Sequence, residues 1–221
     1  MGTLKGGYFL KDGKTKVPGV TTILSRFKES GGLIHWAWKL GTEGKDYREV
    51  RDSAASAGTM AHEAVEAWIH DELITDQWWA LKGGEATIVE RAKKSFGAFL
   101  EWADQTQLKV DETECALVSE DHKYGGTPDA FTIKGKRAVL DWKTSGRLYP
   151  EYLIQIAAYG KLWEENHPND PIVGGFHLLR FDKEYGDFHH HFWTELNTAW
   201  AAFLHLRALY ECDKELKRRV L

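Results

Sequence analysis

The chain has 221 residues, 43% of them apolar, and a formal net charge of −4. This size and composition suit a soluble globular protein, and we expect a single domain over residues 1–221. The negative charge argues against a protein that coats nucleic acid non-specifically, because such proteins are usually basic. The two cysteines cannot supply a four-cysteine metal site, and no apolar run reaches the length of a membrane span.

The first half of the chain has mainly helical patterns. A Gly- and Lys-rich hairpin or loop is expected at 6–16, and apolar residues then recur at three- and four-residue spacing, which predicts amphipathic helices. Gly58 lies inside one of them, so either a helix starts near Thr59 or a longer helix uses Gly58 for a close backbone approach. Most of the ten tryptophans, Trp36, Trp38, Trp78 and Trp79 included, are expected in the core rather than stacked on bases. The predicted helices cover residues 20–24, 34–40, 53–70 and 85–105.

The second half mixes strands with helices. Pro150 suits the first turn of a helix whose apolar stripe runs to Trp163, and a last helix is expected at 196–217. The predicted strands are 110–120, 130–133, 138–142, 172–181 and 187–193, with turns at 123–126 and 134–137. This order predicts an α/β fold with a mixed central sheet flanked by helices. Its parts would be a mainly helical N-terminal elaboration (1–106), a strand-rich core (107–195) and a C-terminal helix (196–221).

Two acidic residues and a lysine lie at the ends of the predicted hairpin strands. A tight hairpin can bring Asp129 and Asp141 to the same end of the sheet. Two carboxylates at one point repel each other unless a cation lies between them, and Mg²⁺ prefers a few carboxylates together with water and phosphate oxygens. Lys143 lies two residues after Asp141, so both side chains project from one face of the strand. An Asp-x-Lys pair on a strand is more often a solvated ion pair, so this pattern alone does not identify a catalytic site.

Four short motifs follow one another between residues 58 and 159. They are Gly58-Thr59-Met60-Ala61-His62, Pro128-Asp129, Asp141-Trp142-Lys143-Thr144-Ser145 and Gln155-Ile156-Ala157-Ala158-Tyr159. In this order they resemble the PD-(D/E)xK nuclease superfamily and, within it, the RecB-type exonuclease branch that includes phage and mitochondrial genome maintenance exonucleases. The resemblance implies a restriction-endonuclease-like core and a nuclease that hydrolyses DNA phosphodiester bonds.

The resemblance also implies roles for the matching residues. The expected catalytic residues are Lys143, Asp129, Asp141, Gln155 and Tyr159, and the expected metal ligands are His62, Asp129, Asp141 and the backbone carbonyl of Trp142. The ion would be Mg²⁺ or Mn²⁺, in one or two copies, and an imidazole ligand favours Mn²⁺ more than an all-oxygen site would. Lys143 would orient or deprotonate the attacking water, or neutralise charge at phosphorus. Gln155 and Tyr159 would hold the lysine or the DNA backbone.

Several nearby polar residues are weaker candidates. Glu66 lies one helical turn after His62 and hydrogen-bonds its ring, touches a second metal or faces solvent. Glu112 and Glu114 precede the hairpin, where a plain strand carboxylate is the more common role. The resemblance implies a glutamate near here, so Glu114 is a candidate to support the metal ligands. The run of three histidines at 189–191 alternates between the two faces of a predicted strand, which argues against a metal site. Candidate nucleic-acid contacts are Thr144, Ser145 and Arg147.

The leading prediction is a metal-dependent DNA exonuclease that acts on DNA ends with a single-strand preference, in recombination, repair or replication. The alternatives are a structure-specific or restriction-like endonuclease on the same scaffold and a catalytically inactive DNA-binding scaffold. Some members of the branch carry an iron–sulfur cluster, which two cysteines exclude here. The expected partners are single-stranded DNA or duplex ends and a single-strand annealing or binding protein, without a membrane. The cytoplasm, of a bacterial host if a phage encodes the chain, is favoured over a mitochondrial location.

Overall fold

The computed structural model describes residues 7–27, 30–110 and 113–220. Its helices are α1 (Val20–Arg26), α2 (Gly31–Thr42), α3 (Tyr47–Ile69), α4 (Asp76–Lys82), α5 (Ala86–Thr106), α6 (Pro150–Asn166) and α7 (Asn197–Arg219). Its strands are β1 (Tyr8–Phe9), β2 (Lys16–Val17), β3 (Leu117–Ser119), β4 (Tyr124–Gly126), β5 (Ala130–Ile133), β6 (Lys136–Lys143), β7 (Phe176–Phe181) and β8 (Phe188–Trp193).

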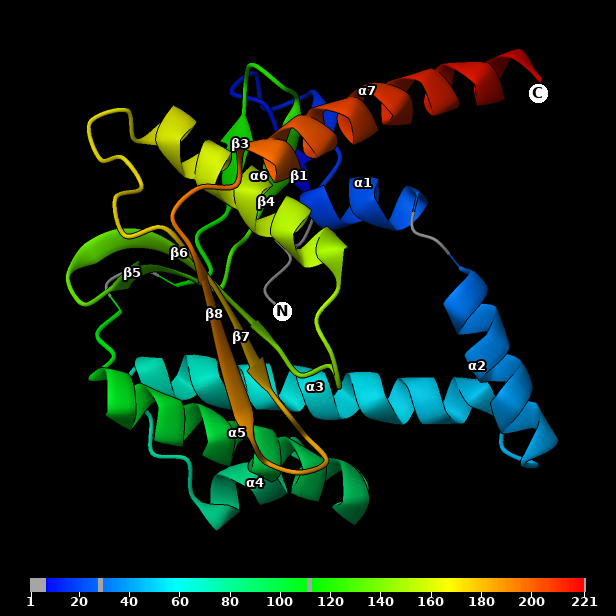
Figure 1. Ribbon diagram of the computed structural model, residues 1–221, viewed down its shortest axis with the longest axis vertical. Helices are drawn as coiled ribbons and strands as arrows, with labels where there is room; N and C mark the ends of the chain where they lie inside the picture. Colours follow the sequence, from blue (N-terminus) through cyan, green and yellow to red (C-terminus); the bar gives the residue numbers. More distant parts are fainter. Residues whose placement is uncertain (1–6, 28–29, 111–112, 221) are drawn as a thin grey trace.

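A four-stranded mixed sheet with the order β5-β6-β7-β8 forms the centre of the fold. β5 and β6 form the expected antiparallel hairpin, β6 and β7 run parallel, and β7 and β8 are antiparallel. Parallel strands need a crossover connection, which α6 supplies between β6 and β7. Figure 1 shows the sheet between two groups of helices, α3 to α5 on one side and α1, α6 and α7 on the other. The predicted mixed sheet flanked by helices is confirmed.

Strand β6 contributes to both faces of the sheet because its side chains alternate. Leu140 and Trp142 point into an apolar core shared with α3, α4 and α5. Val139 points into a second core shared with α1, α6 and α7. Asp141 and Lys143 continue the Val139 face, so the sheet presents them beyond the edge of that second core.

The structure corrects four predictions about local structure. Residues 124–126 form strand β4 and only Lys123 of the expected turn lies in one, since Tyr124 is buried and pairs with Ser119. The strand expected at 110–120 is reduced to β3 and an isolated bridge at Thr113, with 111–112 outside the described residues. Helix α4 was not anticipated, because seven residues are too short for a periodic pattern. The strand expected from 172 begins only at 176, as β7.

The tryptophans divide between core and surface. Trp78 and Trp79 lie in the α3–α5 core, as predicted. Trp38 of α2 is 64% exposed, which contradicts the core prediction, because α2 packs chiefly against α3 and projects from the body of the molecule (Figure 1). Every helix in the described part of the chain is too short or too polar to span a lipid bilayer.

Candidate active site

The two predicted carboxylates meet at one end of the central sheet. Asp129 immediately precedes β5, and Ala130 pairs with Leu140 on β6. This register brings the Asp129 side chain beside residues 141 and 142, where its Oδ2 accepts a 2.7 Å hydrogen bond from the backbone N–H of Trp142. Asp141 is buried, with 2% of its surface exposed. The hairpin thus places both acids together, as the sequence predicts.

A chain of polar contacts runs from Asp141 to helix α6. Lys143 Nζ lies 2.6 Å from Asp141 Oδ2 and donates a 3.1 Å hydrogen bond to Gln155 Oε1. Gln155 Nε2 in turn donates to the hydroxyl of Tyr159 at 2.9 Å. The ammonium group also lies 4.8 Å from the centre of the Tyr152 ring. Gln155 and Tyr159 lie on one face of α6, as their four-residue spacing predicts, and Gln155 holds Lys143 beside the acids.

Burial and mutual charge set the ionisation of the two acids. Burial, together with the charge of Asp129, raises the pKa of Asp141 to about 6, against the opposing effect of Lys143. Burial also acts to raise the pKa of Asp129, but His62, Lys143 and the Trp142 N–H together hold that pKa below its usual value. Burial acts to lower the pKa of Lys143, and the charges of Asp141 and Asp129 outweigh it and raise that pKa. The two acids thus form an electrostatically strained pair, and positive charge between them relieves this strain.

Helix α3 carries the histidine of the first motif to the same place. His62 Nδ1 lies 3.7 Å from Asp129 Oδ1. One turn earlier, Gly58 faces the loop after β6, and a Cβ at Gly58 would lie 2.7 Å from Thr144 Oγ1. Helix α3 is continuous through Gly58, so no helix starts at Thr59. The prediction that Gly58 allows a close backbone approach within a longer helix is confirmed. The absence of a side chain at Gly58 lets His62 approach Asp129.

We expect Gly58→Ala to lower the free energy of unfolding by about 1–2 kcal/mol, because the new Cβ displaces the β-branched Thr144. The matched control is Gly97→Ala, also inside a helix, where a Cβ meets nothing within 4 Å. This substitution should raise the free energy of unfolding by about 0.5–1 kcal/mol, because alanine favours the helix more than glycine does. Urea unfolding measures both changes. Thr144→Ala removes the atom that clashes, so the double variant Gly58→Ala/Thr144→Ala should recover most of the loss. Equal stabilisation by both glycine substitutions would refute the close approach.

The weaker candidates lie at varying distances from this centre. Glu66 accepts hydrogen bonds from His70 at 2.8 Å and Thr113 at 3.0 Å, so the predicted bond to the His62 ring is not formed in the described structure. Glu66 and His70 are themselves one turn apart, and this pairing turns the carboxylate away from His62. Glu114 does line the pocket, and its backbone N–H donates to the carbonyl oxygen of Asp129 at 3.3 Å. Glu112 lies outside the described residues.

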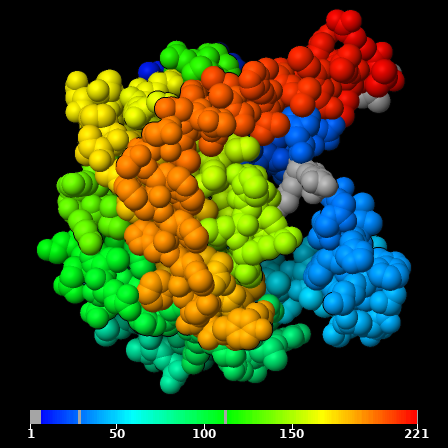
Figure 2. Space-filling view, viewed as in Figure 1, coloured from blue at the N-terminus to red at the C-terminus, as the bar shows by residue number. Residues whose placement is uncertain are grey.

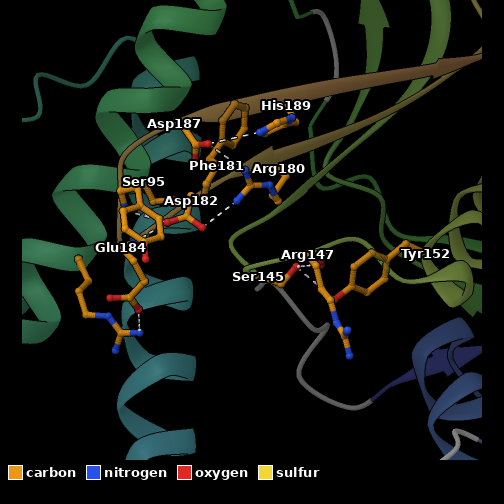
Figure 3. A network of polar contacts seen from close by, with 12 residues as sticks. Ser95, Ser145, Arg147, Tyr152, Arg180, Phe181, Asp182, Glu184, Asp187 and His189 are labelled. Carbon is orange, nitrogen blue, oxygen red and sulfur yellow. Dashed lines mark hydrogen bonds and ion pairs between the residues drawn. The ribbon is translucent and has the colours of Figure 1, made fainter. Parts of the chain in front are cut away.

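The predicted nucleic-acid contacts follow β6 directly. Thr144 and Ser145 line the pocket, whereas Arg147 is exposed outside its lining. The guanidinium carbon of Arg147 lies 4.9 Å from the centre of the Tyr149 ring, and Ser145 Oγ donates to the carbonyl oxygen of Arg147 at 2.8 Å. Figure 3 shows Arg147 extending from this loop beside Tyr152. The loop therefore carries one positive charge at the surface next to the pocket.

The site opens into a cavity of about 410 Å³ between helix α3, the end of β6 and the start of α6. His62, Asp129, Asp141, Lys143 and Gln155 all line it. The surface is hollowed between α2 and the start of α6, as the space-filling view shows (Figure 2). His62 and Lys143 in the lining of the cavity are only half-buried, so a substrate can reach the acids from solvent.

Comparison with known proteins gives structural similarity alone. No family model and no curated protein match the chain. A candidate exonuclease from Eubacterium rectale is 15% identical, with a TM-score of 0.48. The matched region covers 69% of this chain and 64% of the Eubacterium rectale protein. The alkaline exonuclease LHK-Exo of Laribacter hongkongensis is 15% identical, with a TM-score of 0.32 over 56% of this chain and 70% of its own. LHK-Exo in complex with dAMP is 16% identical, with a TM-score of 0.33. The matched region covers 76% of this chain and 97% of LHK-Exo.

The chemistry of the donor groups fits a divalent cation. Asp141 Oδ2 is buried, and the partner that the described residues offer it is the ammonium of Lys143. Two carboxylates and a neutral imidazole suit Mg²⁺ or Mn²⁺. The described side chains do not already form a set of three or more His, Cys, Asp or Glu ligands around one point. A cation bound by His62, Asp129 and Asp141 would therefore draw the three side chains closer together.

Sequence reasoning missed several residues of the pocket, Tyr8 above all. Its hydroxyl lies 2.9 Å from Thr127 Oγ1, and its ring covers Gly125 so closely that a Cβ there would lie 2.3 Å away. Gly125 lies in the segment expected to form a turn, yet in the structure it admits an aromatic ring from 117 residues earlier in the chain. Nothing in the local pattern around Tyr8 signals this contact, because it depends on how the β1–β2 hairpin docks on β4.

Proposed function

We propose that the chain is a Mg²⁺- or Mn²⁺-dependent nuclease that hydrolyses DNA phosphodiester bonds. The observation that carries the proposal is the meeting of Asp129 and Asp141 at one end of the sheet, with Lys143 in contact with Asp141. Two acids from adjacent strands can hold a hard cation, and a lysine beside them can act on the phosphate. The four motifs that gather in this pocket also resemble those of the RecB-type branch of PD-(D/E)xK nucleases.

In this proposal His62, Asp129, Asp141 and the carbonyl of Trp142 hold the ion. When bound, such an ion lowers the pKa of water and neutralises charge on phosphate oxygens. Lys143 donates hydrogen bonds, and its ammonium neutralises negative charge that builds on the scissile phosphate. Gln155 holds Lys143 in position and is held by Tyr159. Each of these roles is assigned to a residue that lines one cavity.

We further propose that the enzyme is an exonuclease that acts on DNA ends and prefers single strands, in recombination, repair or replication. A cavity of about 410 Å³ has the size of a site for one small ligand, such as a single nucleotide at the end of a strand. The resemblance of the motifs favours the same activity. A single-strand annealing or binding protein would be a natural partner, and the bacterial cytoplasm is the proposed location.

We expect the protein to degrade end-labelled linear single-stranded DNA with Mg²⁺ or Mn²⁺ and to leave a closed single-stranded circle intact. An exonuclease needs an end, which the circle lacks. Chelation of the metal with EDTA should reduce the rate by about 10³-fold or more, because the water loses its activating cation. Gel analysis of linear and circular single- and double-stranded DNA measures both effects.

The remaining outcomes separate the competing functions. Linearisation of the circle would identify an endonuclease on the same scaffold. No cleavage of any substrate, together with no heat of Mn²⁺ binding in calorimetry, would identify a scaffold without catalysis. Binding of Mn²⁺ that is lost in Asp129→Asn would support the metal site independently of activity.

A further inference from the structure

A second lysine lines the candidate active site on the side of helix α3. Lys183 lies in the turn between β7 and β8, and its side chain reaches the pocket wall. Its Nζ donates a 2.9 Å hydrogen bond to the carbonyl oxygen of Ala54 in α3. No acidic side chain among the described residues lies within ion-pair distance of this ammonium group. Lys183 is therefore a half-buried cation whose hydrogen-bond partner is a neutral carbonyl oxygen. Its ammonium group has further N–H donors that a ligand could accept.

This arrangement is unfavourable for a lysine in the absence of a ligand. Lysine side chains are mostly exposed, because burial of an ammonium group without a counter-ion costs free energy. Burial lowers the pKa of Lys183, and the charge of Arg91 lowers it further, against smaller opposing effects of Glu184 and Asp182. An anion that entered the pocket would supply the missing negative charge.

The two acids next to Lys183 in the sequence, Asp182 and Glu184, are each paired with an arginine. Glu184 forms an ion pair with Arg91 of α5. Asp182 accepts a 2.7 Å hydrogen bond from Arg180 Nη1. Figure 3 shows Glu184 and Asp182 each directed toward its arginine partner. The two acids adjacent to Lys183 in the sequence are thus unavailable to neutralise it.

The same contacts make the turn rigid. Asp182 Oδ1 accepts the backbone N–H groups of Glu184 and Tyr185 at 2.7 and 2.8 Å. Arg180 bridges from Asp182 to both carboxylate oxygens of Asp187, at 3.2 and 3.1 Å. Figure 3 shows this network around the turn. A rigid turn holds the backbone of Lys183 in place, so the lysine is pre-organised for a ligand.

The position of Lys183 along α3 defines which anion it meets. Ala54, Gly58 and His62 follow one another at four-residue steps, so they lie on one face of the helix. At 1.5 Å per residue, His62 and Ala54 are about 12 Å apart along the axis. The scissile phosphate would lie at the His62 end, beside Asp129. Lys183, at the Ala54 end, would meet a phosphate further along the same strand.

We propose that Lys183 binds a backbone phosphate of the substrate strand outside the scissile position, as a cationic subsite of the pocket. This inference rests on the proposed nuclease function. Of the two lysines that line the pocket, Lys143 is already paired with Asp141, and Lys183 is left to neutralise the strand. A phosphate contact of this kind positions the strand without reading its sequence.

Fluorescence anisotropy with a labelled single-stranded oligonucleotide in EDTA measures binding without cleavage. We expect Lys183→Ala to weaken binding about tenfold at low salt, whatever the sequence. The slope of log K against log salt concentration should become shallower by about 0.7, the value for one lost phosphate contact on a single strand. Lys183→Arg keeps the charge and should retain the wild-type slope. The control Lys93→Ala removes a lysine that is paired with Asp76 outside this pocket and should change neither quantity.

Cleavage measured separately distinguishes this inference from the proposed function. With Mg²⁺ or Mn²⁺, Lys183→Ala should raise KM about tenfold and leave kcat within about threefold, because the subsite lies away from the reacting phosphate. A salt slope in Lys183→Ala equal to that of the wild type, or no binding of the oligonucleotide by the wild type, would overturn the subsite. Binding with the expected slope change but no cleavage would support the subsite and refute the nuclease proposal.

Discussion

The Asp141→Asn variant is expected to lose at least about 10³-fold in kcat/KM on single-stranded DNA while it remains folded. Asparagine keeps the size of the side chain but removes the negative charge that would hold a cation opposite Asp129. It also leaves Lys143 without the carboxylate that lies 2.6 Å from its Nζ, so the ammonium loses its fixed position. The assay is degradation of an end-labelled oligonucleotide with Mn²⁺, together with circular dichroism of the variant.

The matched control is Asp104→Asn, which makes the same change at an exposed position near the end of α5. It should keep full activity, because Asp104 does not line the pocket. Wild-type activity in Asp141→Asn would refute the proposed chemistry, since no other described acid is paired with Lys143. Thermal unfolding distinguishes a catalytic loss from a folding defect. We expect a shift of only a few degrees, because the variant removes a buried charge and at the same time leaves Lys143 unpaired.

The grouping of the candidate site could be predicted from the sequence because its residues are fixed by short-range rules. The hairpin turn at 134–137 sets the register that brings Asp129 beside Trp142. The strand period places Lys143 on the face of Asp141, and the helix period places Tyr159 one turn from Gln155. The approach of α3 is long-range, but Gly58 signals it by the absence of a side chain. The catalytic roles of these residues remain predictions.

The missed parts of the site depend on contacts between segments far apart in the sequence. Tyr8 reaches Gly125, and Lys183 reaches Ala54 across 129 residues. A lysine in a strand turn is ordinarily a solvent-exposed residue, so the sequence around 183 gives no reason to place it in a pocket. For Glu66 the local pattern left two possible partners, because His62 and His70 both lie four residues away on the helix. The structure pairs Glu66 with His70.

The fold was most predictable where long periodic segments bury one face. The helices at α3, α5 and α6 follow their apolar stripes, and the β5–β6 hairpin follows its turn. The turn predicted at 123–126 is wrong for residues 124–126. Two glycines in succession suggest a turn, whereas here they allow Tyr8 and Tyr159 to pack directly on the backbone of β4. The predicted burial of Trp38 is wrong, because an aromatic side chain is buried only where another element packs over its helix. Few residues of other elements pack over α2.

The Phe99→Ala variant is expected to lower the free energy of unfolding by about 3–5 kcal/mol, which is a fall in Tm of roughly 10 °C for a chain of this size. Phe99 is fully buried, and its ring contacts those of Trp68, Trp142 and Phe181, so its removal opens a cavity between α3, α5 and the sheet. The control Phe192→Ala, at a residue 53% exposed, should cost about 1 kcal/mol or less. Urea and thermal unfolding measure both.

The effect of Phe99→Ala should extend to the candidate site, because the two faces of β6 share one backbone. The Trp142 ring packs on Phe99 at a centroid distance of 5.9 Å, while the Trp142 N–H holds Asp129. Loss of the Phe99 ring therefore loosens the strand that positions both acids. We expect kcat at 25 °C to fall several-fold even where the variant is still fully folded, because small misplacements of reacting groups are costly. Unchanged kcat in a variant destabilised by 3–5 kcal/mol would show that the site is held independently of the α3–α5 core.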